Sequence, residues 1–239
     1  MGVTKVAIGD AILTSVWVFG LLVLRILAIK ITAFVGLQFV SIVNLFITPI
    51  LNTCFVLTIR LIGRALGGAS FNPSVTVSFY AAGLRPNSSL TSMAIRFPAQ
   101  AIGGVIGARL LLLVIPTQYN HMLKGPLLKV DLHTGAMVEG VLTFIHNLIN
   151  LSIMLKGPKN PFLKVYLFSV ATVILVVLGS GFTGPSLNPA NAFGWAYANN
   201  KHNTWEQFYV YWICPFVGAT LAALVYRFLF ISSTKQKKA

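Results

Sequence analysis

Acidic residues are almost missing from this chain of 239 residues. Four Asp or Glu stand against 18 Lys or Arg, and charged residues make up 9% of the sequence. In a soluble domain, charged residues normally make up about a quarter of the sequence, so this composition does not fit a water-exposed surface. With 56% hydrophobic residues and a mean hydropathy of +0.81, the chain is expected to lie in a lipid bilayer.

Cysteine is also scarce, and its placement excludes two classes of site. Cys54 and Cys214 both fall within long apolar segments, so neither a disulfide framework nor a cysteine metal site is predicted. We expect both thiols to be buried. His146 is a lone imidazole in another apolar segment, without a second His at metal-ligand spacing. The sequence therefore predicts no metal and no cofactor.

Long hydrophobic runs fill most of the chain. Six of them come near or above the ~20 residues that a helix needs to cross a bilayer. The predicted spans are Val6–Ile29, Val35–Ile59, Met93–Ile115, Thr134–Leu155, Phe162–Ser180 and Trp205–Ile231. The sequence predicts an all-α membrane protein with a single transmembrane domain over residues 1–239.

The net charge of +14 would suggest a nucleic-acid partner in a soluble chain. Here the basic residues are scattered at the ends of spans, without a cluster that includes aromatic side chains, so no nucleic-acid partner is expected. Most Lys and Arg fall on one side of the bilayer if both termini are cytoplasmic, in agreement with the positive-inside tendency. The lipid bilayer is the predicted partner, and both termini are predicted to be cytoplasmic.

A short motif occurs twice in the chain, as Asn72-Pro73-Ser74 and as Asn188-Pro189-Ala190. Asn is a good helix N-cap because its side chain accepts from the first unpaired backbone N–H groups, and Pro suits the next position because its missing N–H would be unpaired anyway. The apolar run after each motif has about ten residues, roughly half the length of a bilayer-spanning helix. The motifs predict two half-helices that enter the membrane and stop.

Other residues repeat with the motifs. Asp10 in the first span and Glu139 in the fourth are each followed, after two intervening residues, by a Leu-Thr pair, and Gly103-Gly104 in the third span align with Gly218-Ala219 in the sixth. These small residues are expected to permit close packing of helices. Because each half holds three spans, an odd number, the second half must be inverted in the membrane.

The repeats run over about residues 6–115 and 134–231, followed by a basic tail at 232–239. In an inverted repeat the two half-helices enter from opposite faces and meet near the midplane. Each N-terminus carries about half a positive charge, so the pair would repel cations in a passage between them. The side-chain amides of Asn72 and Asn188 could donate hydrogen bonds to a passing neutral molecule.

With paired Asn-Pro boxes in inverted halves, the chain resembles the aquaporins of the major intrinsic protein family over essentially its whole length. Its basic composition, Asp10 in place of the more common Glu, Ser74 in the first box and Asn191 after the second resemble the small basic intrinsic proteins of plants. The resemblance implies six transmembrane helices plus two re-entrant half-helices. It also implies a passive channel for water or small neutral solutes, not an enzyme, and a homotetramer with one pore per subunit. In the family, acids equivalent to Asp10 and Glu139 support the half-helix loops.

The residues aligned with the family's selectivity filter depart from the usual ones. Asn191 stands where most members carry Arg, and Val176 stands where water-selective members usually have His. Pro185 is the loop position, and Leu51 is the matching residue of the second span. This filter would be uncharged and partly apolar, so cation exclusion would depend mainly on the half-helix dipoles. Glycerol specificity is not supported, because Ala192 replaces the Asp of glycerol-conducting members.

Alternatives remain open at this point. The channel could serve mainly another small neutral solute, such as hydrogen peroxide. An ion-coupled transporter could use Asp10 or Glu139 as its coupling carboxylate, since acids within spans are usually functional or paired. An intramembrane serine protease could use Ser70 and His146. The repeat argues against the protease, because Ser186 is the counterpart of Ser70.

The basic tail carries a further pattern. Lys235 and Lys237 stand fifth and third from the carboxyl terminus, which resembles a dilysine retrieval signal of the endoplasmic reticulum. The other interpretation is an ordinary basic tail against anionic lipid. The sequence favours retrieval and predicts residence in the endoplasmic reticulum membrane.

Overall fold

The computed structural model describes residues 2–37, 41–84 and 89–232, which contain helices and turns but no strand. Six helical segments are long and apolar enough to cross a bilayer. Five are α1 (Val3–Phe34), α2 (Ser41–Ala65), α4 (Leu90–Val114), α5 (Leu132–Lys156) and α6 (Pro161–Gly179). The sixth joins α8 (Trp205–Phe208), the π-helical η2 (Tyr209–Ile213), α9 (Cys214–Tyr226) and the π-helical η3 (Arg227–Ser232). Two short helices, α3 (Pro73–Ala81) and α7 (Pro189–Ala198), and the 3-10 turn η1 (Thr117–Met122) complete the described chain.

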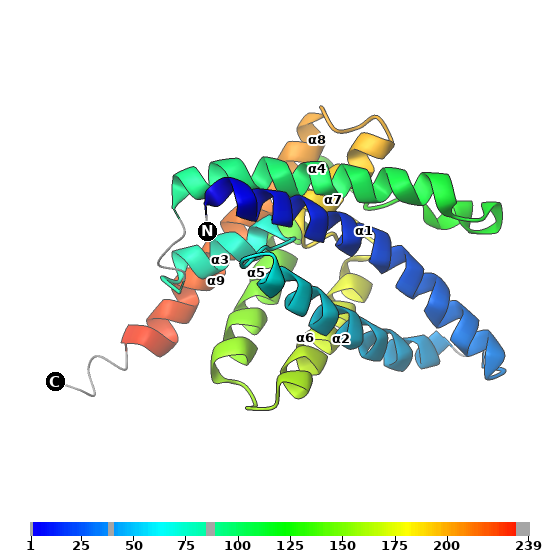
Figure 1. Ribbon diagram of the computed structural model, residues 1–239, viewed down its shortest axis with the longest axis horizontal. Coiled ribbons are helices and arrows are strands. Elements are labelled where there is room, and N and C mark those ends of the chain that lie inside the picture. Colours follow the sequence, from blue (N-terminus) through cyan, green and yellow to red (C-terminus); the bar gives the residue numbers. More distant parts are fainter. Residues whose placement is uncertain (1, 38–40, 85–88, 233–239) are drawn as a thin grey trace.

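This arrangement confirms the predicted membrane fold, with six spans and two half-helices. The start of α1 and the end of η3 lie toward the same end of the molecule (Figure 1), which we call the inner side. The end of α1 and the start of α2 lie at the opposite end, the outer side.

The boundary between the first two spans differs from the prediction. The helix α1 continues to Phe34, and the predicted start of the second span at Val35 is wrong because α2 begins at Ser41. Gly36 follows α1 with a left-handed backbone (φ 72°), a conformation that glycine adopts readily and that commonly ends helices. Hydropathy does not reveal this turn, because Val35 is itself apolar.

The two halves of the chain pack in the same way. The helix α1 lies alongside α4 (Figure 1), and α5 lies alongside α9. A Cβ on Gly103 of α4 would collide with the carbonyl oxygen of Ala11 in α1, and one on Gly218 of α9 would collide with that of Gly140 in α5. The two crossings use equivalent positions of the repeat. The expected role of these small residues in close helix packing is confirmed.

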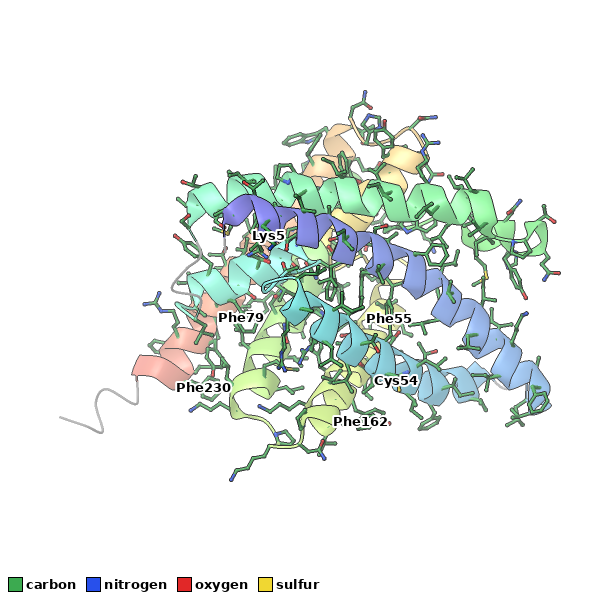
Figure 2. The ribbon with its side chains drawn as sticks, viewed as in Figure 1. Lys5, Cys54, Phe55, Phe79, Phe162 and Phe230 are labelled. Atoms are coloured by element: carbon green, nitrogen blue, oxygen red, sulfur yellow. The ribbon has the colours of Figure 1, made fainter. Side chains whose placement is uncertain are left out.

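Each half-helix is held by the third span of the opposite half. The helix α7 packs against α4, and α3 packs against α9. Gly104 of α4 lies directly against the backbone of Ala190 and Gly194 in α7. At the inner side, Phe79 of α3 and Phe230 of η3 pack against the same buried cluster (Figure 2). The two half-helices therefore tie the halves of the repeat together.

The cysteines differ from the prediction in part. Cys54 is exposed on α2, so its predicted burial is wrong, and Cys214 is partly buried at the start of α9. The next residue, Phe55, stacks on Trp17 of α1 at a ring distance of 5.5 Å. Cys54 and Phe55 are labelled on α2 in Figure 2. One step along a helix turns the side chain by about 100°, so Cys54 lies off the packed face.

Candidate functional site

Both half-helices begin at the proline of their box and are capped by the asparagine before it. Asn72 Oδ1 accepts a hydrogen bond from the Ser74 N–H of α3 at 3.0 Å. Asn188 Oδ1 accepts one from the Ala190 N–H of α7 at 3.1 Å. Both asparagines are buried. Because the oxygen of each amide is engaged in capping, the direction of its NH2 group is fixed.

The two NH2 groups join the boxes to each other. Asn72 Nδ2 donates to the carbonyl oxygen of Leu187 at 3.0 Å, and Asn188 Nδ2 donates to that of Phe71 at 2.9 Å. Each acceptor belongs to the residue directly before the other asparagine, so the two bonds are counterparts in the repeat. An amide NH2 carries two hydrogens, and each asparagine keeps a second N–H for a further acceptor.

Leu187 is the strained residue of this centre. Its φ of 54° lies in the left-handed region, which is unfavourable for a branched side chain. Its N–H donates to Glu139 Oε1 at 2.8 Å, and its carbonyl accepts from Asn72 and from Ser74 Oγ at 3.1 Å. Ser74 Oγ also lies 2.8 Å from Asn72 Oδ1, so its single hydrogen serves one of two acceptors, one in its own box and one in the other loop.

Asp10 holds the loop before α3 and is fully buried. Its Oδ1 accepts from the Ser70 N–H at 2.7 Å. Arg96 of α4 pairs with both carboxylate oxygens, at 2.6 and 2.8 Å, and Gln100 Nε2 donates to Oδ2 at 3.1 Å. The guanidinium also donates to the carbonyl of Gly68 at 3.3 Å. Such a bidentate, hydrogen-bonded geometry is what allows an ion pair to be buried.

Glu139, the counterpart in the second half, is equally buried but has no cationic partner among the described residues. Its Oε1 accepts from the N–H groups of Ser186 and Leu187 at 3.0 and 2.8 Å. Its Oε2 accepts from Thr183 Oγ1 at 2.8 Å, and the carbonyl of Thr183 accepts from the Tyr211 hydroxyl at 3.0 Å. Hydrogen bonds alone stabilise this carboxylate, so the two loops differ in charge.

Two predicted filter residues lie in or beside the second loop. Pro185 is buried and packs on Gly179. Asn191, in the first turn of α7, donates from Nδ2 to Ser186 Oγ at 3.0 Å, while its Oδ1 is buried without a partner among the described residues. Asn191 thus folds back on the loop and places no formal charge there.

The other two predicted filter residues lie on neighbouring spans. Val176 of α6 packs against a buried cluster of Leu142, Leu175 and Leu187. Leu51 is half-buried on α2, and α2 packs against α6. The surroundings of Val176 are apolar, as its own side chain is.

The sequence pattern does not single out the partners of Asp10. Arg96 and Gln100 stand four residues apart, on one face of α4, and both reach the same carboxylate. A signal for them exists, because an Arg within an apolar span requires a buried partner and acids are scarce in this chain.

An aromatic group beside the boxes is also absent from the sequence prediction. Trp17 of α1 stacks on Phe71 at a ring distance of 4.2 Å and on Phe55 of α2 at 5.5 Å. Phe71 directly precedes Asn72, so these rings lie next to the meeting point of the half-helices.

The protease alternative requires a base beside Ser70. The Ser70 hydroxyl is instead bonded to Thr76 Oγ1 at 2.9 Å and to Gln100 Nε2 at 2.9 Å. Neither group is a base, and His146 lies on α5. Among the described residues, Ser70 is therefore part of loop geometry and not of a Ser-His pair.

Replacement of Arg96 by Gln should destabilise the protein by about 3 to 5 kcal/mol, because the charge of Asp10 is left buried without its partner. The double variant Asp10→Asn/Arg96→Gln should recover part of this loss, since no charge remains. The control is Arg64→Gln, at an exposed position of α2. Unfolding in detergent micelles measures the difference, and an Arg96 variant as stable as the control would contradict the prediction.

Comparisons with known proteins agree with this geometry. The sequence model of the family described as "Major intrinsic protein" matches residues 4–226. The chain is 50% identical to "Aquaporin SIP1-1" of Oryza sativa subsp. japonica, over 98% of this chain and 96% of that protein. It is 49% identical to "Aquaporin SIP1-2" of Zea mays, again over 98% and 96%. It is 44% identical to "Aquaporin SIP1-1" of Arabidopsis thaliana, over 100% and 98%.

A solved structure shares the fold. It is the X-ray structure of the aquaglyceroporin from Plasmodium falciparum, with a TM-score of 0.67 at 19% identity, covering 98% of this chain and 100% of that chain. The extent of these matches, together with the two capped half-helices, shows that the chain belongs to the major intrinsic protein family and, within it, to the small basic intrinsic proteins.

Proposed function

We propose that this passive membrane channel conducts water between the two Asn-Pro boxes. The proposal is carried by the reciprocal bonds from Asn72 to Leu187 and from Asn188 to Phe71, which fix both amides and leave each a second N–H. A molecule passing the boxes meets two donors in fixed directions. A water held by two donors through its oxygen is poorly placed to relay a proton.

Cation exclusion in this proposal depends on the half-helix N-termini. Each contributes about half a positive charge at the level of the boxes. Asn191 contributes no formal charge on the outer side. The positive charge of Arg96 is paired with Asp10 and does not add to the barrier as a free charge.

Hydrogen peroxide is the second candidate solute. The observation in its favour is the filter itself, where Asn191 folds onto Ser186 and Val176 lies among leucines. A neutral solute slightly larger than water meets no charged side chain at these positions. An ion-coupled transporter is disfavoured, because Asp10 and Glu139 are both fully engaged in hydrogen bonds to the loops.

We also propose a single channel domain over residues 1–239, a homotetramer, cytoplasmic termini and residence in the endoplasmic reticulum membrane. Support for the topology comes from the distribution of Lys and Arg. Support for the location comes from Lys235 and Lys237, which lie outside the described residues. The tetramer is what the resemblance to the aquaporin family implies.

Proteoliposomes containing the purified chain should shrink faster than empty vesicles when an impermeant osmolyte is added, with a low activation energy and without a proton leak. Stopped-flow light scattering measures the rate, and parallel runs with glycerol and hydrogen peroxide rank the solutes. Shrinkage at the rate of empty vesicles together with rapid peroxide entry would replace water by peroxide as the substrate. No flux of either solute would refute the proposed channel function.

Asn188→Asp should raise proton conductance by about tenfold, equivalent to ~1.4 kcal/mol of barrier. The carboxylate loses the donor to the Phe71 carbonyl and places negative charge against the positive end of α7. The matched control is Asn160→Asp, which changes the exposed cap of α6 in the same way. A pH-sensitive dye inside the vesicles reports the leak, and equal tightness of both variants would refute the role of Asn188.

The double variant Lys235→Ala/Lys237→Ala should move the protein from reticular membranes to the cell surface. The control Lys156→Ala/Lys159→Ala removes two lysines near the connection between α5 and α6 and should leave the location unchanged. Fluorescence microscopy of tagged chains, with the tag at the amino terminus, distinguishes them. Unchanged reticular staining of the tail variant would show that the two lysines are not a retrieval signal.

A further inference from the structure

One face of α5 carries four buried polar side chains. The second, third and fourth of them follow the first by three, four and seven residues along the chain, and this spacing places all four on a single face of the helix. None is more than 5% exposed. They are Thr143, His146, Asn147 and Asn150.

Each of these side chains has a polar atom without a hydrogen-bond partner among the described residues. The atoms are Thr143 Oγ1, His146 Nδ1, Asn147 Oδ1 and Asn150 Oδ1, and Ser169 Oγ of α6 is a fifth. A buried polar atom without a partner loses its hydration and gains nothing in return. Buried polar groups in native proteins therefore normally meet protein or water, and five such atoms on two packed helices indicate a place where hydroxylic molecules bind.

The helix α6 packs against α5 and carries the fifth of these atoms. The His146 ring packs against Phe168 of α6, with 4.8 Å between centroids, and Ser169 is the next residue of that helix. Ser169 is 3% exposed. His146 has no group of three or more His, Cys, Asp or Glu around it within the described chain, so a metal ion does not explain its burial.

The cluster lies on the inner side of the boxes. Glu139 of α5 holds the outer loop at Leu187, and α5 then runs toward the inner side. His146 follows Glu139 by seven residues, which is about 10 Å along a helix. Farther along the same helix, Leu151 packs in a buried cluster with Ala82, at the end of the inner half-helix α3.

The equivalent face of α1 has a different character. The counterparts of the four polar residues in the repeat are Thr14, Trp17, Val18 and Leu21. The Thr14 hydroxyl donates to the carbonyl of Asp10 at 2.7 Å and is thereby satisfied. Trp17, in the place of His146, stacks on Phe71. Because the repeat is inverted, the aromatic face belongs to the outer half and the polar face to the inner half.

We propose that the passage is chemically asymmetric and that its inner half is a polar chamber in which His146, Asn150 and Ser169 bind the permeating molecule. The inference rests on the proposed channel function and names the residues that select the solute after the boxes. The chamber favours small molecules that both donate and accept hydrogen bonds, such as water and hydrogen peroxide. Without these three side chains this section of the passage would be less polar, and apolar sections of a pore resist wetting.

Cysteine labelling tests whether the chamber is reached by solvent. In a chain with Cys54→Ser and Cys214→Ala, Ser169→Cys should react with a small, neutral, hydrophilic thiosulfonate at least tenfold faster than Leu151→Cys. Leu151 is the matched control, since it is fully buried on α5 but packs among apolar side chains. Labelling is followed by mass spectrometry of the folded protein in liposomes. Equal, slow reaction at both positions would overturn the proposal.

Flux measurements test the role of His146. His146→Leu keeps a similar volume without polar atoms and should lower the osmotic water permeability at least fivefold. His146→Gln, which keeps a donor and an acceptor, should retain most of it. The control is Val141→Leu, at an exposed position of the same helix. Permeability of the Leu variant equal to that of the control would overturn the selecting role of His146.

The two assays separate this inference from the proposed function. If the parent chain shows no osmotic flux, the proposed water conduction fails, and the labelling rates still decide whether the inner half is a solvent-reached chamber. Thermal unfolding in detergent identifies any variant that is not folded. The labelled position Ser169 lies on α6, whereas His146 lies on α5, and the labelling chains keep His146, so a folding defect of the His146 variants does not remove the test.

Discussion

Backbone polar groups cannot be left without partners in the bilayer core, and this constraint shapes the molecule around its two boxes. The loops before α3 and α7 leave the helical hydrogen-bonding pattern at membrane depth, which is tolerated only where protein or a water-filled passage surrounds them. Asp10 and Glu139 accept from the loop N–H groups, and each box asparagine donates to a carbonyl of the other loop. The glycine crossings of the long helices bring α4 and α9 close enough to hold the half-helices in place.

The parts of this structure that depend on local chemistry are those that the sequence predicts. Asparagine capping and proline at the first helical position are local signals, and both half-helices begin where those signals stand. Contacts between distant segments are not local. The pairing of Asp10 with Arg96 joins residues that are 86 positions apart, and no periodicity reveals it. The end of α1 depends on the backbone of Gly36, which hydropathy does not record.

The two halves solve the same problem of loop support with different charge. The first half uses a carboxylate with a guanidinium and an amide, and the second uses a carboxylate with backbone N–H groups, a hydroxyl and no cation among the described residues. A family member with Arg at the position of Asn191 would carry a cation near that second carboxylate. In this chain, the buried acid of the second loop is held by the Thr183 hydroxyl and by the N–H groups of Ser186 and Leu187. Asn191, at the predicted filter position, adds no formal charge beside this loop.

The internal repeat distinguishes residues that build the fold, which keep the same form in both halves, from residues that differ between the halves. The helix crossings and the bonds between the boxes keep the same form in both halves, because each satisfies backbone or allows helices to approach. Trp17 and His146 occupy equivalent positions but differ in size, polarity and partners. Neither is needed to satisfy the backbone, so the two positions are free to differ. An asymmetric passage is thus compatible with a symmetric scaffold, and differences between the halves mark the positions where selectivity can be adjusted without loss of the fold.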